Sequence, residues 1–308
     1  MIWGETMEYC FAHLKERVKD SAEQTDRESL FEALAGIRGN TLTAGVGGSS
    51  VVSAYLAKVL ERKNHLVCTD VFPRDLLYRD LSGYQNIAVC SYSGRNIGVD
   101  AAFDNSLNHY LFSGSIRESV HPLQYTVRDE EMSFVSFAGT LIPMALLLLY
   151  YTDNDTALLN RILDGEPDFE TVPERDAAEI LYGYENSVSA RFLESALTEG
   201  GLCAAVMHEK YNYCHGRCKL NDAYHNDLIY FADSSELDEV FQRELPGFYP
   251  DVMTIGRKYE DDIINEFALT YECMFLCRRM AEKRGKDLSL KIIPEISEVL
   301  YTYCGKLK

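Results

Sequence analysis

Short apolar runs alternate with longer segments of helical spacing along most of the chain. The runs at 41–44, 66–69, 86–90 and 124–127 are typical of buried parallel strands. The segments with helical spacing lie at 50–62, 96–108 and 136–151. This alternation predicts a parallel sheet with helices on both of its faces.

The same alternation resumes in the second half of the chain. Further strands are predicted at 179–182, 203–207, 228–232 and 252–255, with helices at 186–198, 235–243 and 259–283. The charged, proline-containing stretch between the halves is interpreted as a connection. We therefore predict an α/β protein with a helical N-terminal segment, a first sheet unit, a connection and a second sheet unit, with bounds at 1–39, 40–152, 153–176 and 177–308.

The N-terminal segment carries one start signal and two stop signals for a helix. Thr25 and Glu28 have the spacing of a capping box, and apolar residues at helical spacing follow them. Gly36 and Gly39 are expected to end this helix. Further along, the longest apolar run, 141–151, is too short to cross a bilayer and predicts a buried core helix.

Composition narrows the class of protein. The chain has 308 residues, with 48 acidic and 30 basic side chains and a net charge of −18, which argues against nucleic acid as a partner. Its nine cysteines include no C-x-x-C pair, and its first residues do not have the pattern of a secretion signal. We therefore expect a cytoplasmic protein in a reducing compartment, with neither a membrane nor a nucleic acid as partner.

Two turns of small residues follow predicted strands and precede predicted helices. They are "AGVGGSS" at 44–50 and "CSYSG" at 90–94. Backbone N–H groups at a helix start bind phosphate when small residues allow close approach. Each turn alone also fits a tight loop with a capping serine. Because ligands bind at the carboxyl edge of such sheets, the two turns together favour an anion site.

The segments "AGVGGSSVVSAYLAKVL" and "YQNIAVCSYSGRN" resemble the sugar isomerase (SIS) domain family. They are most similar to the bifunctional phosphoglucose/phosphomannose isomerases and to the isomerase domain of glucosamine-6-phosphate synthase. The resemblance implies two SIS-type subdomains, each a parallel sheet between helices, and a bound sugar phosphate. The ligand-binding residues that it implies are Gly48, Ser49, Ser50, Ser91, Ser93, Gly94 and Asn96.

Two positions beside the second turn depart from the family pattern. Asn96 stands where threonine is usual, so that an amide replaces a hydroxyl. Arg95 stands where asparagine or glutamate is usual, and it either adds charge to the anion site or points to solvent. These departures leave open whether the chain holds the family's usual substrate.

The second half supplies residue types suited to proton transfer. Aldose–ketose isomerisation requires a carboxylate base over C1 and C2, and a histidine can assist opening of the sugar ring. The resemblance implies Glu199 as this base and His215 of an H-G motif as the ring-opening group, and their sixteen-residue separation matches the synthase branch. Glu194 and Glu209 remain alternative bases, and His208 is the alternative histidine.

Three further features of the second half bear on ligands. Arg217 replaces a proline that is common in the synthase branch and contacts either a second anionic group or an acidic neighbour. The family's C-terminal lysine corresponds to Lys306 or Lys308. Cys214 and Cys218 flank His215, but no second ligand cluster is nearby in sequence, so we expect no metal.

The leading expectation is a phosphosugar aldose–ketose isomerase that acts through an enediolate without a cofactor. Because the family's histidine often reaches a neighbouring subunit, the resemblance also implies a homodimer or larger homo-oligomer. Two alternatives remain. One is a phosphosugar sensor that binds without chemistry, and the other is a lyase or deglycase that acts on a sugar-phosphate conjugate.

Overall fold

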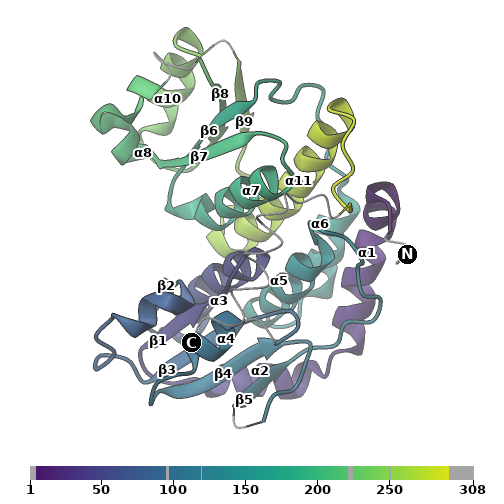
Figure 1. Ribbon diagram of the computed structural model, residues 1–308, viewed down its shortest axis with the longest axis vertical. Coiled ribbons are helices and arrows are strands. Elements are labelled where there is room, and N and C mark those ends of the chain that lie inside the picture. The colour runs from purple at the N-terminus through teal and green to yellow at the C-terminus, as the bar shows by residue number, and fades with distance from the viewer. Residues whose placement is uncertain (1–4, 95–96, 119, 221–224, 250, 291–308) are drawn as a thin grey trace. The chain divides into compact units, whose positions relative to one another are not determined.

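The computed structural model describes residues 5–94, 97–118, 120–220, 225–249 and 251–290, which form two compact units (Figure 1). The first unit runs to Asn160 and also includes Ser289 and Leu290, whereas the second runs from Arg161 to Leu288. Ser289 is tied to the first unit by its carbonyl, which accepts a hydrogen bond from Phe134 N at 3.0 Å.

The first unit contains a five-stranded parallel sheet in the order β2-β1-β3-β4-β5. Its strands are β1 (Thr41–Ala44), β2 (Cys68–Val71), β3 (Asn86–Cys90), β4 (Asn108–Ser113) and β5 (His121–Gln124). The predictions for β1 and β3 are confirmed to the residue. These two strands lie in the middle of the sheet, where every position is buried and the apolar signal is strongest.

The helix predicted at 96–108 and the strand predicted at 124–127 are wrong in extent, and β4 was not predicted. Helix α4 covers only Ile97–Ala102, so the predicted helix at 96–108 ends early, and β5 ends where the predicted strand at 124–127 begins. The Asn105 side chain explains the early end. Its amide donates to Ala102 O at 2.7 Å and its oxygen accepts from Leu107 N at 3.0 Å, which turns the chain into β4.

Helices cover both faces of the first sheet. Helix α3 (Gly48–Asn64) lies on one face, while α4 and the short helix η1 (Pro73–Leu77) pack on the other through an apolar cluster that includes Leu42 and Val89. Helix α5 (Ala138–Tyr151) packs against α3, and nearly all of its residues are buried. The prediction of a buried core helix at 141–151 is thus confirmed.

The N-terminal segment forms two helices, α1 (Met7–Gln24) and α2 (Arg27–Gly36). The predicted capping box at Thr25 is wrong, because Thr25 ends α1 by donating from its N–H and hydroxyl to Ser21 O. Asp26 caps α2 instead, since its carboxylate accepts from Ser29 N at 3.2 Å. The predicted end of the helix at Gly36 is confirmed.

The second unit repeats this architecture with four parallel strands in the order β7-β6-β8-β9. They are β6 (Ala177–Tyr182), β7 (Ala204–Glu209), β8 (Asp227–Phe231) and β9 (Val252–Ile255). The strand predicted at 252–255 is confirmed to the residue, and the other three lie within two residues of their predicted bounds. Both units are therefore α/β structures built on a parallel sheet.

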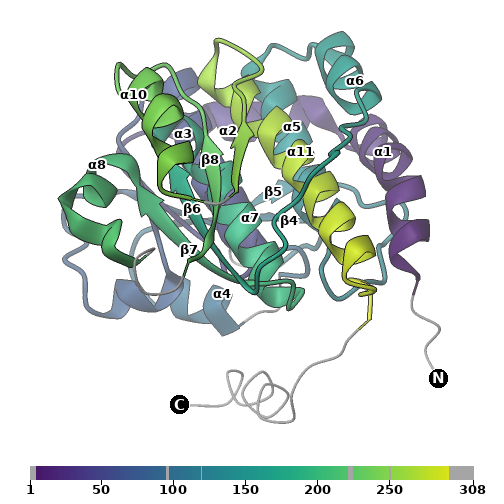
Figure 2. The ribbon, with the colours of Figure 1, turned by 90° about the horizontal axis from the view of Figure 1, so that it is seen from above.

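Helices α7 (Ser187–Glu199) and α11 (Asp262–Lys283) lie side by side against the second sheet (Figures 1 and 2). The other face is covered by shorter elements whose apolar side chains pack on Leu181 and Tyr230. The shorter elements of this unit are η2 (Tyr184–Asn186), α8 (Lys210–Asn212), η3 (Tyr213–Arg217), α10 (Asp238–Glu244) and η4 (Leu245–Gly247).

One helix was missed in the stretch predicted to be an irregular connection. Helix α6 (Thr156–Asp164) is only nine residues long and lies in a charged region. Its few apolar positions were therefore not interpreted as a helix. Asp155 supports its start by accepting from Leu158 N at 2.9 Å. Among the described residues, no helix is long and apolar enough to span a membrane.

Candidate functional site

A cavity of about 180 Å³ lies at the carboxyl end of β1 and β3 in the first unit. The turn after β1 contributes Gly45 and Ser49, and the turn after β3 contributes Ser91, Tyr92 and Ser93. No acidic or basic side chain is among the described residues that line it. Hydroxyl and backbone groups therefore dominate the polar chemistry of this cavity.

The turn after β1 has room only for glycine at position 45. A Cβ at Gly45 would lie 2.1 Å from Ser49 O, so no larger residue fits there. Within the turn, Ser49 N donates to Val46 O at 3.2 Å and Ser50 N donates to Gly47 O at 2.8 Å. This arrangement places Ser49 at the cavity wall and at the beginning of α3, a helix of 17 residues.

Two other residues of this turn, Gly48 and Ser50, pack against other parts of the protein and do not line the cavity. A Cβ at Gly48 would lie 2.8 Å from Thr140 Oγ1 on α5, so glycine allows the two helices to approach. Ser50 is buried in the first turn of α3 and is not part of the cavity lining. The structure thus brings Ser49 to the cavity but not Gly48 or Ser50, although all three were predicted to lie near the ligand.

A hydrogen bond to the Ser91 side chain stabilises the turn after β3. Gly94 N donates to Ser91 Oγ at 3.1 Å, and Gly94 has a φ of +64°, which favours glycine. The Gly94 N–H, predicted to bind phosphate, therefore has a partner inside the turn. Because Ser91 Oγ is the acceptor in that bond, its own hydrogen can be donated to a ligand.

A second cavity, of about 360 Å³, is also lined by Tyr92 and Ser93. Its remaining lining includes Gly114 and Ser115, which follow β4, and Glu130. The sequence predictions missed this part of the site because no strand was predicted between 109 and 123, where nearly all of β4 lies. The segment "YLFSGS" at 110–115 shows the same signal as the other two turns, an apolar run followed by small polar residues.

Four residues with predicted or alternative roles lie outside the described residues. They are Arg95, Asn96, Lys306 and Lys308.

Glu199 is the last residue of α7 in the second unit, and its position is well defined. Leu202 N donates to Leu197 O at 2.8 Å, Gly201 N donates to Thr198 O at 3.0 Å, and Gly201 has a φ of +58°. This is a Schellman motif, which ends a helix with a fixed geometry. Glu199 thus lies on an ordered helix end and not on a frayed one.

The protein environment raises the pKa of the Glu199 carboxyl group. Desolvation by the surrounding protein raises its pKa, although part of the side chain remains exposed, and a hydrogen bond from Ser195 Oγ at 3.1 Å opposes the rise. The alternative base Glu194 also has a raised pKa, through desolvation and the nearby charge of Glu199. The third candidate base, Glu209, is already hydrogen-bonded to the backbone, since its carboxylate accepts from Tyr211 N and Asn212 N.

His215 lies in the π-helical turn η3, where Gly216 has a φ of +102°. This glycine kink presents His215 and Arg217 to solvent. The alternative histidine, His208, has a different environment. It is only 4% exposed, and its Nε2 lies 3.4 Å from Oε2 of the buried Glu179. Of the two histidines, His215 is therefore the one that a ligand or another subunit can reach.

The cysteines beside His215 do not form part of a recognisable metal site. Cys214 and Cys218 are exposed, and burial of part of Cys214 raises its thiol pKa. Throughout the described part of the chain, no three His, Cys, Asp or Glu side chains are grouped as metal ligands would be.

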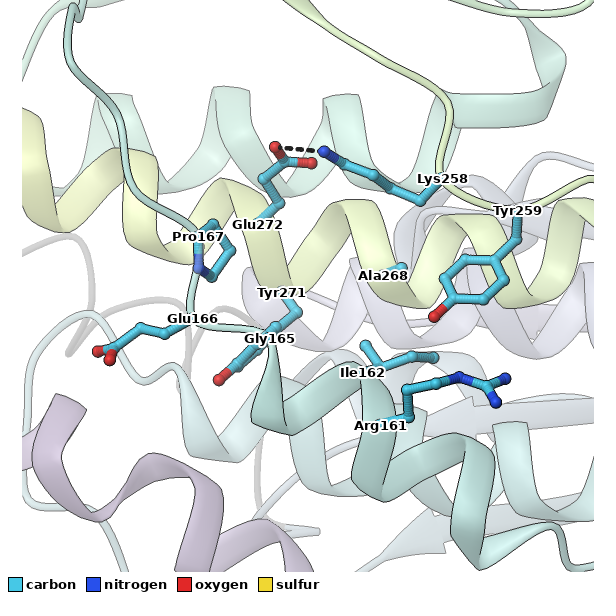
Figure 3. A pocket seen from close by; sticks show the side chains of 10 residues that line it. All are labelled: Arg161, Ile162, Gly165, Glu166, Pro167, Lys258, Tyr259, Ala268, Tyr271 and Glu272. Carbon is cyan, nitrogen blue, oxygen red and sulfur yellow. Dashed lines mark ion pairs between the residues drawn. The ribbon is translucent and has the colours of Figure 1, made fainter.

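A third cavity, of about 390 Å³, lies between α6, α11 and the loop after β9 in the second unit (Figure 3). Lys258 and Glu272 point toward each other across it, with Nζ and Oε1 3.0 Å apart. Burial raises the pKa of Glu272, and the hydrogen bond from Lys258 opposes this rise. Because its most buried charge is already paired within the protein, this cavity is a weaker candidate for an anion than the serine-lined one.

Comparison with protein-family models and with curated proteins gives no match to this sequence. Comparison with solved structures gives extensive matches. The C-terminal domain of glucosamine-fructose-6-phosphate aminotransferase from Francisella tularensis matches with a TM-score of 0.69 at 13% identity, over 94% of this chain and 98% of that chain. Tagatose-6-phosphate ketose/aldose isomerase from Escherichia coli matches with a TM-score of 0.69 at 15% identity, over 94% and 96%.

Glucosamine-6-phosphate deaminase from Thermotoga maritima matches with a TM-score of 0.66 at 17% identity, over 90% of this chain and 96% of that chain. The chain has the fold of these proteins. At the level of the fold, this confirms the resemblance to the sugar isomerase domain family. The match extends over nearly the whole chain and includes both units.

Proposed function

We propose that this protein binds a sugar phosphate and interconverts its aldose and ketose forms through an enediolate. The observation that carries the proposal is the serine-lined cavity at the carboxyl edge of the first sheet. Ser49, Ser91 and Ser93 would donate to the phosphate, and the start of α3 adds a favourable helix dipole. No carboxylate is among the described residues that line the cavity, which favours an anion in a chain with a net charge of −18.

In this proposal Glu199 moves the proton between C1 and C2, and His215 assists ring opening. The raised pKa of Glu199 supports its role, because a base is most effective when its pKa approaches the working pH. The exposed position of His215 suits a contribution to a neighbouring subunit, so we expect a homodimer or larger homo-oligomer. No cofactor is needed for this proton transfer, and we expect the protein to work in the cytoplasm.

The structural neighbours support the substrate class. One is named as a ketose/aldose isomerase of a sugar phosphate, and two others are named for enzymes of amino-sugar phosphates. A sensor that binds without chemistry is the main alternative, and a lyase or deglycase is the other. Proton exchange separates the sensor from the isomerase, because only the enzyme forms an enediolate.

A panel of hexose and pentose phosphates in deuterated water tests the proposal directly. We expect at least one sugar phosphate to exchange its C2 proton for deuterium in the presence of the protein, as followed by proton NMR. Binding of a sugar phosphate without any exchange would support the sensor. Neither binding nor exchange across the panel would overturn the proposed function.

Ser93→Ala is expected to weaken sugar-phosphate binding by about 10- to 100-fold, the effect of losing one hydrogen bond to a charged group. Isothermal titration calorimetry measures this change. Ser187→Ala is a matched control, because Ser187 Oγ donates to Tyr184 O in the second unit and does not line the cavity. Equal affinities of the Ser93→Ala variant and the native protein would show that the phosphate lies elsewhere.

Ser195→Ala is expected to shift the acid limb of the kcat/KM profile to higher pH. The Ser195 hydroxyl stabilises the charged form of Glu199, so its removal raises the Glu199 pKa further. Because the deprotonated carboxylate is the proposed base, activity on the acid side of the profile should fall while the plateau at high pH changes little. The Ser187→Ala variant should keep the native profile, and an unshifted limb in Ser195→Ala would argue against Glu199 as the titrating base.

A further inference from the structure

The second unit contains counterparts of the strands β1 and β3 and of the helices α3 and α4 that surround the serine-lined cavity. Strand β6 pairs with β7 and β8, as β1 pairs with β2 and β3. The turn after β6 leads to α7 as the turn after β1 leads to α3, and the turn after β8 leads to α10 as the turn after β3 leads to α4. The carboxyl edge of the second sheet is therefore the place where a second phosphate would be expected.

At this edge, a carboxylate of the protein itself contacts the turn after β8. Glu185 Oε2 accepts from Ser234 N at 3.0 Å, and Glu185 Oε1 accepts a short hydrogen bond from Ser234 Oγ. Arg257, from the loop after β9, forms an ion pair with the same carboxylate. Backbone N–H, serine hydroxyl and guanidinium are the groups that recognise a phosphate, and here all three are bound to Glu185.

A second internal carboxylate occupies the start of α7. Glu266 on α11 is fully buried, and its oxygens accept from Val188 N at 3.0 Å, Ser189 N at 2.9 Å and Ser189 Oγ at 2.8 Å. In the first unit, the start of the corresponding helix α3 lies at the cavity wall through Ser49. The position that an anion takes at a helix start is thus filled by Glu266 in the second unit.

A further cation at this edge, Lys210, is also paired with carboxylates. The Lys210 side chain is buried, and its Nζ lies 2.6 Å from Asp233 Oδ2 and 3.5 Å from Asp238 Oδ1. Arg257 is shared with Asp262 at 3.0 Å as well as with Glu185. Lys210 and Arg257 are therefore both paired within the second unit.

We propose that Glu185 is a built-in anion that closes the second unit's counterpart of the phosphate cavity. The chain accordingly binds one phosphate, in the first unit, and loss of the Glu185 carboxylate opens a second, weaker site for oxoanions at Ser234 and Arg257. The inference goes beyond the proposed function, since it concerns the second unit and does not depend on any reaction. It adds a stoichiometry of one ligand per chain, and this number rests on the proposed phosphate site of the first unit.

The test isolates the second unit by using the full chain with Ser93→Ala as background. Inorganic phosphate is the probe, and the readouts are the thermal midpoint and a phosphorus NMR titration. We expect Ser93→Ala/Glu185→Ala to gain about 3 °C or more at 50 mM phosphate relative to Ser93→Ala alone, because a ligand of the folded state raises its stability. Adding Arg257→Gln to this double variant should remove the gain.

Glu282→Ala in the same background is the matched control. Glu282 also binds arginines, Arg278 and Arg279, but all three lie on α11 itself and none belongs to the turns after β6, β8 or β9. This variant should respond to phosphate no more than Ser93→Ala does, which accounts for the general stabilising effect of the salt. A gain as large as that of the Glu185 variant would overturn the inference.

Two further outcomes would also overturn it. One is a folded Ser93→Ala/Glu185→Ala protein with no extra response to phosphate. The other is a Ser93→Ala protein that already binds phosphate at Arg257 while Glu185 is present. Should the alanine variant fail to fold, Glu185→Gln keeps an acceptor for Ser234 while it removes the charge, and it must then show a smaller gain of the same sign. An equal phosphate response of the native protein and Ser93→Ala would instead contradict the phosphate site of the first unit.

Discussion

Glu199→Gln is expected to lower turnover of the preferred sugar phosphate by about 10²- to 10⁴-fold while its dissociation constant changes little. The amide has nearly the same shape as the carboxylate but cannot accept the C2 proton. Because the phosphate is proposed to bind through Ser49, Ser91 and Ser93, affinity should not depend on the charge of residue 199. Turnover is measured by the isomerisation rate, and affinity by calorimetry.

Glu194→Gln is the control for this experiment, since Glu194 lies on the same helix and also has a raised pKa. It should keep most of the native turnover. A loss in Glu194→Gln with native rates in Glu199→Gln would transfer the role of base to Glu194. Native turnover in both variants and in Glu209→Gln would exclude all three candidate bases.

Glu266→Ala is expected to destabilise the second unit by about 3–5 kcal/mol. The Glu266 carboxylate accepts from two backbone N–H groups and one hydroxyl, all buried at the start of α7. Truncation leaves the N–H groups of Val188 and Ser189 buried without this acceptor. Urea unfolding followed by circular dichroism measures the loss, with the denaturant slope compared between variants.

Glu282→Ala provides a comparison on the same helix. Its ion pairs with Arg278 and Arg279 are exposed, so the free energy of unfolding should change by less than about 1 kcal/mol. Glu266→Gln should fall between the two variants, because the amide oxygen still accepts hydrogen bonds. A cost below about 1 kcal/mol for Glu266→Ala would mean that water or a shifted side chain replaces the carboxylate.

The hydrophobic pattern predicted the strands well where they are buried. It failed where the side chains of a turn determine where a helix ends and a strand begins. β1, β3 and β9 were predicted to the residue from their apolar runs. β4 was missed because "NHYLFS" begins with polar residues and is separated from α4 only by the turn that the Asn105 side chain makes. Such a turn depends on side-chain hydrogen bonds, which periodicity does not report.

The same holds for the candidate site: features set by neighbouring residues were predicted, and features set by contacts between distant residues were not. Ser49, Ser91 and Ser93 were predicted from their turns, and the structure places all three along one cavity. Gly48 was assigned to the ligand although it packs against Thr140, a residue far away in the sequence. A pattern of small residues shows that close approach is possible, but it does not show which group makes the approach.

The hydrogen bond from Phe134 N to Ser289 O has a consequence for the order in which the two units can be completed. The second unit is continuous from Arg161 to Leu288, whereas the first unit takes residues from both sides of it. During synthesis, the ribosome completes every residue of the second unit before the first unit receives Ser289. The first unit, which holds the proposed phosphate site, therefore begins to form first on the ribosome and is the last to be finished.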